Sequence, residues 1–179
     1  MLEDLSHHIL DIAENGVNAG ANEITIELEV DEFIRLTVSD NGRGMDESTA
    51  RSVVDPFYTT RTERRVGLGL PFLKQLTDLC DGEFTLSSTL GKGTTVSASF
   101  RRDSVDTPPL GDIPSTLLTL LIGNGHIHWR YIHRVEEREF TLDSVELEEA
   151  LGGGNPFADV ALAVGIKEFI ATNIEELSI

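Results

Sequence analysis

Asp40-Asn41-Gly42-Arg43-Gly44-Met45 follows an alternating run of apolar and polar residues, 34–39, which predicts a half-buried β-strand. An aspartate leaving a strand, with glycines two and four positions later, predicts a tight turn. The backbone at Gly42 and Gly44 can approach a flat ligand closely because no Cβ intervenes. Asp40 would offer a carboxylate acceptor in the same space. The alternative is a plain surface turn, since Asp-Asn-Gly is common turn chemistry.

The length and composition indicate a soluble globular protein. At 179 residues, the chain forms one domain, or one domain with a substantial extension. No apolar run reaches the roughly 18 residues of a membrane span, and residues 1–4 lack a signal-peptide pattern. The single cysteine, Cys80, excludes an internal disulfide framework and suits a reducing compartment. We therefore expect a cytoplasmic protein that does not enter a membrane.

The net charge of −17 argues against nucleic acid and anionic membrane surfaces as partners. Binding to both depends on cationic groups that neutralise phosphates. An anionic ligand would need local help from glycine-loop amides, a metal ion or a small basic cluster. Arg61, Arg64 and Arg65 form the densest such cluster.

Residues 2–19 have the spacing of an amphipathic helix that carries a polar stripe. Asp11, Asn15 and Asn18 lie at i, i+4 and i+7, on one face. A solvated face is one reading of this stripe. The other is a ligand site, because the Asn15 oxygen can bind Mg²⁺ and Asp11 can hold or deprotonate a nucleophile.

The predicted order of elements favours an α+β fold with an antiparallel-rich sheet and helices on one face. Alternating apolar residues predict strands over 23–30 and 33–39, joined as a hairpin. A short helix is expected over 46–54 and a longer one over 70–80, followed by strands near 83–88 and 94–101. Gly67 and Gly69 then lie at the start of the longer helix, where backbone amides and the helix dipole favour phosphate.

Five segments in order resemble the ATP-binding domain shared by gyrase-type topoisomerases, heat-shock ATPase chaperones, sensor histidine kinases and mismatch-repair ATPases. They are Asp11–Ala21, Asp40–Met45, Pro56–Thr60, Gly67–Leu70 and Gly91–Thr94, within residues 1–100. The third segment resembles the phenylalanine box of histidine kinases in particular. The resemblance implies the two-layer α/β sandwich of that superfamily.

The resemblance also implies a site for ATP and Mg²⁺. Asn15 would bind the Mg²⁺, Asp40 would take the adenine amino group, and Asp11 would be the catalytic carboxylate. The ATP-binding residues implied in this way are Asn15, Asn18, Asp40, Gly42, Gly44, Met45, Phe57, Thr60, Arg61, Gly67, Leu68, Gly69, Leu70 and Thr94.

Three features depart from the family pattern. The second glycine box usually begins one glycine earlier, where this chain has Arg65, so closure over the phosphates could differ. Histidine kinases often carry an amide at the position of Asp11, whereas hydrolysing members carry a carboxylate, which leaves hydrolysis open. Only ten residues precede Asp11, so we expect no phosphoacceptor histidine and no dimerisation domain before it.

Residues 104–179 are expected to form a small αββα extension behind the ATP-binding domain, 1–103. The pattern predicts an apolar helix over 114–122, strands over 126–134 and 138–143, and helices over 143–151 and from 155 to about 177. His126, His128 and His133 suggest a metal site, but an exposed strand face is favoured because no cysteine accompanies them. The extension would pack on the ATP domain or hold a partner.

The predicted function is Mg-ATP binding, with transfer of the γ-phosphoryl group to a separate partner protein in signalling. Catalysis of phosphoryl transfer is mostly positioning and charge neutralisation, so another chain can supply the acceptor. The alternatives are an ATP-hydrolysing conformational switch and a nucleotide-dependent module that partners recognise through residues 112–179. The sequence leaves the acceptor, the pathway and the oligomeric state open.

Overall fold

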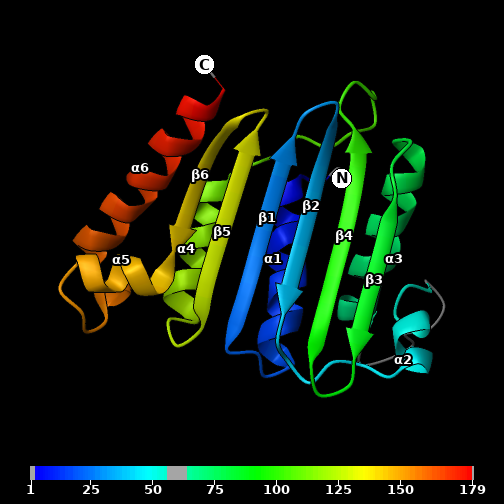
Figure 1. The fold of residues 1–179 in the computed structure, drawn as a ribbon, viewed down its shortest axis with the longest axis horizontal. Helices are drawn as coiled ribbons and strands as arrows, with labels where there is room; N and C mark the ends of the chain where they lie inside the picture. The colour runs from blue at the N-terminus through cyan, green and yellow to red at the C-terminus, as the bar shows by residue number, and fades with distance from the viewer. Residues whose placement is uncertain (1–2, 56–63, 179) are drawn as a thin grey trace.

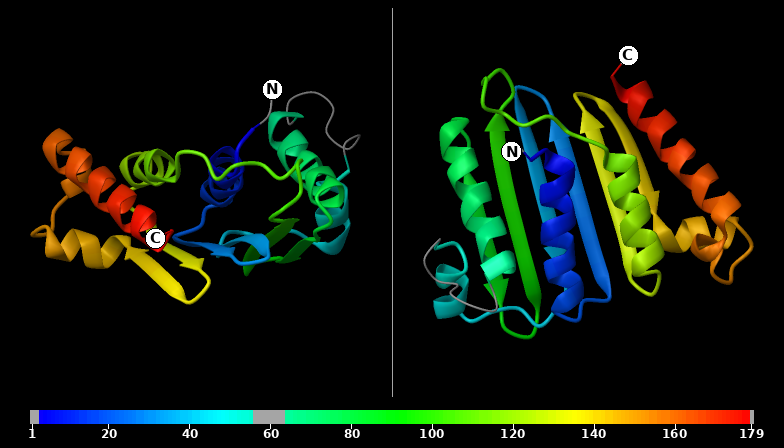
Figure 2. Two further views of the ribbon diagram at one scale, coloured as in Figure 1. Left: turned by 90° about the horizontal axis from the view of Figure 1, so that it is seen from above. Right: turned by 180° about the vertical axis from the view of Figure 1, so that it is seen from behind.

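The computed structural model describes residues 3–55 and 64–178, and for residues 64–68 it describes the backbone alone. One six-stranded sheet in the order β3-β4-β2-β1-β5-β6 spans the molecule. Helices α1, α3 and α4 lie side by side on one face of this sheet, and α6 lies beside the β6 edge (Figures 1 and 2). The predicted α+β class, with helices on one face of an antiparallel-rich sheet, is confirmed.

The helices and strands follow the predicted order with small shifts at their ends. The first part of the chain contains α1 (Leu5–Asn18), β1 (Glu23–Val30), β2 (Phe33–Asp40), α2 (Glu47–Ser52), α3 (Arg64–Leu79), β3 (Phe84–Thr89) and β4 (Gly93–Arg101). The second part contains α4 (Ile113–Gly123), β5 (His128–Val135), β6 (Arg138–Asp143), α5 (Ser144–Ala150), the 3-10 turn η1 (Pro156–Ala158) and α6 (Val160–Leu177).

Helix α3 is where the structure corrects the sequence prediction. The helix begins at Arg64, six residues before the predicted start at 70, so Gly67 and Gly69 lie inside its first turns instead of opening it. Glycine lowers helix propensity, and packing of the helix against the sheet overrides that preference. Leu79 is exposed, because the 3.6-residue period of the helix turns Thr77 and Cys80 inward.

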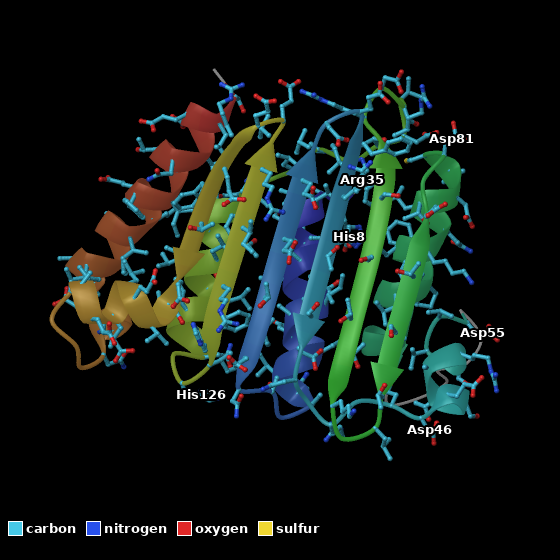
Figure 3. The ribbon with its side chains drawn as sticks, viewed as in Figure 1. His8, Arg35, Asp46, Asp55, Asp81 and His126 are labelled. Carbon is cyan, nitrogen blue, oxygen red and sulfur yellow. The ribbon has the colours of Figure 1, made fainter. Side chains whose placement is uncertain are left out.

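The two faces of the sheet differ in character. Side chains that face the helices form the core, and Ile24, Ile26 and Leu28 of β1 are almost fully buried there. The opposite face is open and carries polar and charged side chains (Figure 3). On it Thr37 and Ser97 share a hydrogen bond of 2.9 Å. The strands therefore alternate, as expected for a sheet covered on one side.

Strands β5 and β6 extend the same sheet. β5 pairs parallel with β1 along its whole length, from Glu23 opposite His128 to Val30 opposite Val135. Buried residues on both sides of this pair belong to one hydrophobic cluster. The division of the chain into an ATP-binding domain, 1–103, and an extension, 104–179, therefore stays a prediction.

The three histidines of the extension occupy different environments. His133 is buried on the helix side and hydrogen-bonds Tyr131, while His128 lies toward the open face, 2.8 Å from the Asp143 carboxylate. His126 is exposed. Across 3–55 and 64–178, no three histidine, cysteine or acidic residues come together as a metal site would require. Nor does any helix in these ranges combine the length and hydropathy needed to cross a bilayer.

Candidate nucleotide site between α1 and α3

A furrow with a cavity of about 280 Å³ runs along the outer side of α1, next to the start of α3. The two helices run antiparallel, because His8 meets Phe72 while Asp11, one turn later in α1, faces the earlier residue Gly69. The predicted stripe forms one wall of this cavity. The lining residues are His8, Asp11, Ile12, Glu14, Asn15, Asn18, Gly69 and Leu70.

Asp40 ends β2 beside the C-terminal part of α1, at Gly16. Its Oδ1 accepts a hydrogen bond of 2.8 Å from the Gly42 amide, and the Thr94 amide also donates to its carboxylate. Burial raises the pKa of Asp40, while these two amide donors work in the opposite direction. The carboxyl group is therefore partly desolvated, with acceptor capacity left for a ligand.

Gly16 allows Asp40 to lie against α1. A Cβ at this position would be 2.9 Å from the Asp40 Cβ and 3.1 Å from the Ile24 Cδ1, so only glycine fits without displacement. The contact also fixes the direction of the site. Asp40 lies beside Gly16, and from there Asn15, Asp11 and His8 follow in order along α1.

The first and third glycine segments interlock through their backbones. A Cβ at Gly44 would lie 2.0 Å from the Thr89 carbonyl oxygen, and one at Gly93 would lie 1.9 Å from the Asp40 carbonyl oxygen. Both residues also have positive φ, 69° and 126°, where L side chains are strained. Gly44 and Gly93 therefore have a structural role in the turn that follows Asp40, whether or not they contact a ligand.

Ser88 joins three pieces of the same end of the site. Its hydroxyl accepts from the Met45 amide at 2.8 Å, lies 2.8 Å from the Thr94 hydroxyl, and donates to the Gly93 carbonyl at 3.0 Å. Arg43 adds a second connection, donating to the Asn18 carbonyl at the end of α1. The predicted residues Asp40, Gly42, Gly44, Met45 and Thr94 are thus held together.

Asp11 carries the perturbed carboxyl group of the furrow. Burial is the main cause that raises its pKa, and the nearby Glu3 and Glu14 carboxylates add to the increase, against a small opposing effect of His7. A methyl group placed on Gly69 would be 3.7 Å from Asp11 Oδ2, so the carboxylate faces α3 across the furrow. A carboxylate whose pKa is raised is a suitable proton acceptor.

The furrow wall suits a magnesium ion shared with phosphate. Asn15, Asp11 and Glu14 supply amide and carboxylate oxygens, the ligand type that Mg²⁺ prefers. Magnesium usually keeps several waters and is bound through one or two protein oxygens plus phosphate oxygens. The side chains present fit such an ion, and Asn15, the predicted ligand, is among them.

Three of the predicted ATP-binding residues lie outside the part of the chain that the structure describes. Phe57, Thr60 and Arg61 lie outside the described residues, and so does the predicted phenylalanine box to which the first two belong. Gly67 and Leu68 lie in the first turns of α3. Gly69 and Leu70 line the furrow as predicted positions of the site.

Sequence reasoning missed Gly16, Ser88 and His8. A glycine within a strongly periodic helix was the available signal for Gly16, because glycine is unfavourable there unless something approaches closely. Ser88 is one of several Ser and Thr residues in its strand, and nothing local distinguishes it. His8 lies outside the predicted polar stripe, but it lines the furrow.

A helix-covered sheet with a polar furrow along α1, a half-buried aspartate and interlocked glycine turns is the arrangement expected of a nucleotide-binding class of protein. Residues 2–104 match the family described as histidine kinase-, DNA gyrase B-, and HSP90-like ATPase. The chain belongs to this family. The matched region ends just after β4, so α4, β5, β6, α5 and α6 lie beyond it.

Several curated relatives are sensor kinases. The chain is 34% identical over 103 residues to a putative sensor protein of Shewanella frigidimarina, covering 55% of this chain and 16% of that protein. It is 33% identical to the autoinducer 2 sensor kinase/phosphatase of Vibrio vulnificus, covering 52% and 12%. It is 31% identical to sporulation kinase C of Bacillus subtilis, covering 50% and 21%. The chain thus spans about a fifth or less of these relatives.

One solved structure resembles a larger part of the fold. The N-terminal domain of a DNA repair protein superposes with a TM-score of 0.57 at 17% identity, covering 86% of this chain and 58% of that one. At this identity the likeness shows the fold alone.

Proposed function

We propose that the chain binds ATP with Mg²⁺ and transfers the γ-phosphoryl group to a separate protein. The observation that carries this proposal is that Asp40 lies against Gly16 of α1, while the neighbouring Asn15 and, one turn earlier, Asp11 line the cavity on the same helix. Membership of the ATPase family and the sensor-kinase relatives support it.

Asp40 recognises the adenine ring. Its carboxylate already accepts from the Gly42 and Thr94 amides, and remaining lone pairs accept from the exocyclic amino group of the base. Gly42 and Gly44 leave the adjacent backbone without side chains. A hydrogen bond between a partly buried carboxylate and an amino donor is among the stronger kinds, so Asp40 supplies base specificity as well as affinity.

The furrow receives the triphosphate. Asn15 holds the magnesium ion, which neutralises phosphate charge when bound. This neutralisation matters because Asp11, Glu14 and the chain's net charge of −17 would otherwise repel the polyphosphate. Gly69 of α3 lies on the opposite side of the furrow and leaves room there, because it carries no side chain.

Asp11 acts as the proton acceptor. The incoming nucleophile forms a bond to the γ-phosphorus while the bond from that phosphorus to the β,γ-bridging oxygen breaks, and ADP leaves. The proton of the nucleophile passes to the Asp11 carboxylate. Placing that carboxylate and the γ-phosphate in fixed geometry is the main contribution of the protein to such a reaction.

A second candidate function is ATP hydrolysis that drives a conformational switch. The observation that favours it is Asp11 itself, whose carboxyl group has a raised pKa and faces a cavity large enough for water. In that case water takes the place of the acceptor side chain. The switch would change how residues 112–179 bind a partner.

The substitution Asp11→Asn tests the proton-acceptor role. Because the amide cannot take the proton, we expect ATP binding to persist while phosphoryl transfer falls about 100-fold or more, the usual range for loss of a general base. Transfer of γ-³²P to a co-purified protein measures the first candidate, and release of labelled phosphate measures the second. Asp78→Asn, on the exposed side of α3, is the matched control.

Unchanged rates of phosphoryl transfer and phosphate release in Asp11→Asn would show that Asp11 is not the proton acceptor. A chain that binds ATP but neither labels a partner nor releases phosphate would leave a nucleotide-dependent binding module as the remaining function.

A further inference from the structure

The two edge strands of the sheet, β6 and β3, are protected to different degrees. β6 carries the charged residues Arg138, Glu139 and Asp143, and α6 lies beside it (Figure 1). β3, at the other edge, has the sequence Phe-Thr-Leu-Ser-Ser-Thr, without charge or proline. Natural proteins usually protect an edge strand with charges, proline or a covering helix, because its free backbone groups can pair with another strand. The sequence of β3 provides no such protection.

The backbone groups of Phe84 and Leu86 in β3 point away from the sheet. The Ser99 amide donates to the Glu83 carbonyl at 2.8 Å, so these two residues form a hydrogen-bonded pair at the start of the antiparallel β3–β4 ladder. Hydrogen-bonded and non-hydrogen-bonded pairs alternate along such a ladder, which turns the N–H and C=O groups of Phe84 and Leu86 outward. In the part of the chain that the structure describes, no backbone hydrogen bond from another element reaches them. They can therefore pair with a further strand.

The side chains along this edge suit an uncharged and partly apolar partner. Thr85 is exposed on the open face of the sheet, while Phe84 and Leu86 are half-buried on the helix face. Two larger apolar side chains are exposed close by in the chain. Leu79 ends α3, which packs on β3, and is 64% exposed, and Leu90 directly follows β3 and is 67% exposed.

Charge restricts which surfaces of two copies of this chain can meet. At a net charge of −17, two copies repel each other over most of their surface. An antiparallel arrangement that pairs Phe84 with Leu86 of a second copy puts Thr85 opposite its own equivalent and Glu83 opposite Ser87. No two charged side chains face each other in this register. The uncharged strand is thus complementary to itself, which favours a second copy as its partner.

We propose that β3 pairs antiparallel with β3 of a second copy, across a twofold axis at Thr85, so that one sheet runs through the dimer. The outward N–H and C=O groups of Phe84 and Leu86 form the hydrogen bonds. On the helix face, the side chains of these two residues pack on each other, and Leu90 of one copy comes level with the Leu79 end of the other. Each contact occurs twice, as in any isologous interface.

The inference goes beyond the proposed function and does not depend on it, because none of the pairing residues lines the furrow. The dimer is therefore expected with and without ATP. It also has a consequence for the site. Ser88 in the same strand accepts from the Met45 amide, so pairing at β3 supports the loop after Asp40 in both copies.

Sedimentation equilibrium of the full chain tests the dimer, and we expect a mass that approaches twice the chain mass of 19.6 kDa as concentration rises. Thr85→Lys puts two like charges directly opposite each other at the axis, so the dissociation constant should rise about fivefold or more. Thr141→Lys, the same change on the exposed face of the other edge strand, should leave it unchanged. A mixture of Thr85→Lys and Thr85→Glu should dimerise more tightly than either variant alone.

A disulfide tests the register. The Cα atoms of a non-hydrogen-bonded antiparallel pair lie about 4.5 Å apart, within reach of a disulfide, so Thr85→Cys should cross-link two copies on mild oxidation. Ser87→Cys is the control, because its two sulfur atoms would be four residues apart along the strands, roughly 13 Å. The native Cys80 is buried.

A wild type that stays monomeric at every concentration would overturn the inference and leave this edge to a strand of another protein. An unchanged dissociation constant in Thr85→Lys would also overturn it, and so would equal cross-linking through Thr85→Cys and Ser87→Cys. Melting temperatures of all variants show whether each is folded. If Thr85→Lys does not fold, the cross-linking of Thr85→Cys against Ser87→Cys decides.

Discussion

Tyr131 and His133 are polar side chains inside the core of β5, on the side that faces the helices. Tyr131 Oη and His133 Nδ1 lie 2.8 Å apart, and their rings meet edge to face. Burial lowers the pKa of His133 to about 4, below the ordinary 6.5. The folded protein therefore holds this histidine neutral at pH values where the unfolded chain protonates it.

This difference predicts a pH-dependent stability. Above about pH 6.5 both states are neutral and the full stability is present, whereas between 6.5 and about 4 the unfolded state binds more protons and stability is lost. We expect about 2 kcal/mol of this loss between about pH 7 and about pH 5.

Urea unfolding of wild type and His133→Gln at both pH values measures the effect, because glutamine does not titrate. His8, also buried with a lowered pKa, contributes equally to both proteins and cancels in the comparison. If both proteins lose the same stability between these pH values, His133 is not the cause of the loss.

At the scale of elements, the contact between α1 and the end of β2 shapes the proposed nucleotide site. Gly16→Ala places a methyl group 2.9 Å from the Asp40 Cβ, so the aspartate must move away from its amide donors. We expect ATP affinity to fall at least tenfold, the order expected when a hydrogen bond to a charged group is lost. Isothermal titration calorimetry measures it.

Gly165→Ala is the matched control for that helix glycine. Position 165 lies in α6 with nothing within 4 Å of an added Cβ, so alanine there should raise stability by about 0.5–1 kcal/mol and leave ATP affinity unchanged. A wild-type affinity in Gly16→Ala would mean that Asp40 tolerates the displacement or does not bind the base.

Local pattern predicted the elements that depend on local chemistry. The alternation of 23–30 and the helical spacing of 2–19 set β1 and α1 to within a few residues, and the same spacing put Asp11, Asn15 and Asn18 on one wall. The start of α3 at Arg64 could not be read in this way. Glycines and Pro71 lower helix propensity there, and contact with α1 outweighs it.

Contacts between distant parts of the chain account for the rest. The Gly16 contact with Asp40 joins a helix to the end of a strand, and His8 packs against Phe72 of another helix. The parallel pairing of β1 with β5 is also non-local, since the local sequence of a strand does not determine which other strand it pairs with. Contacts of this kind can be identified only from the folded structure.

The whole molecule is one sheet, and the expected extension is part of it. Besides the β1–β5 ladder, the amides of Leu5 and Ser6 at the start of α1 donate to the carbonyls of Pro109 and Leu110. Because residues of α1 line the furrow, these hydrogen bonds mean that the segment after residue 103 helps to hold α1 in position.

We therefore expect residues 1–103 expressed alone to lose cooperative thermal unfolding, because β1 becomes an edge strand and the core cluster is cut. A chain cleaved at an engineered protease site within the exposed segment 103–106 should instead stay together in gel filtration and keep its melting transition. A cooperative, ATP-binding 1–103 fragment would contradict the expectation and support two independent folding units.

The base specificity of Asp40 is the central claim of the proposed function. The carboxylate accepts from the amino group of adenine, whereas guanine presents a carbonyl oxygen at the corresponding position and would be repelled. Calorimetric titration of wild type, Asp40→Asn and the exposed control Asp106→Asn with Mg-ATP and Mg-GTP tests this directly. We predict at least tenfold tighter binding of ATP than GTP in the wild type and the control, with that preference lost in Asp40→Asn; equal nucleotide preference in all three proteins would contradict the account.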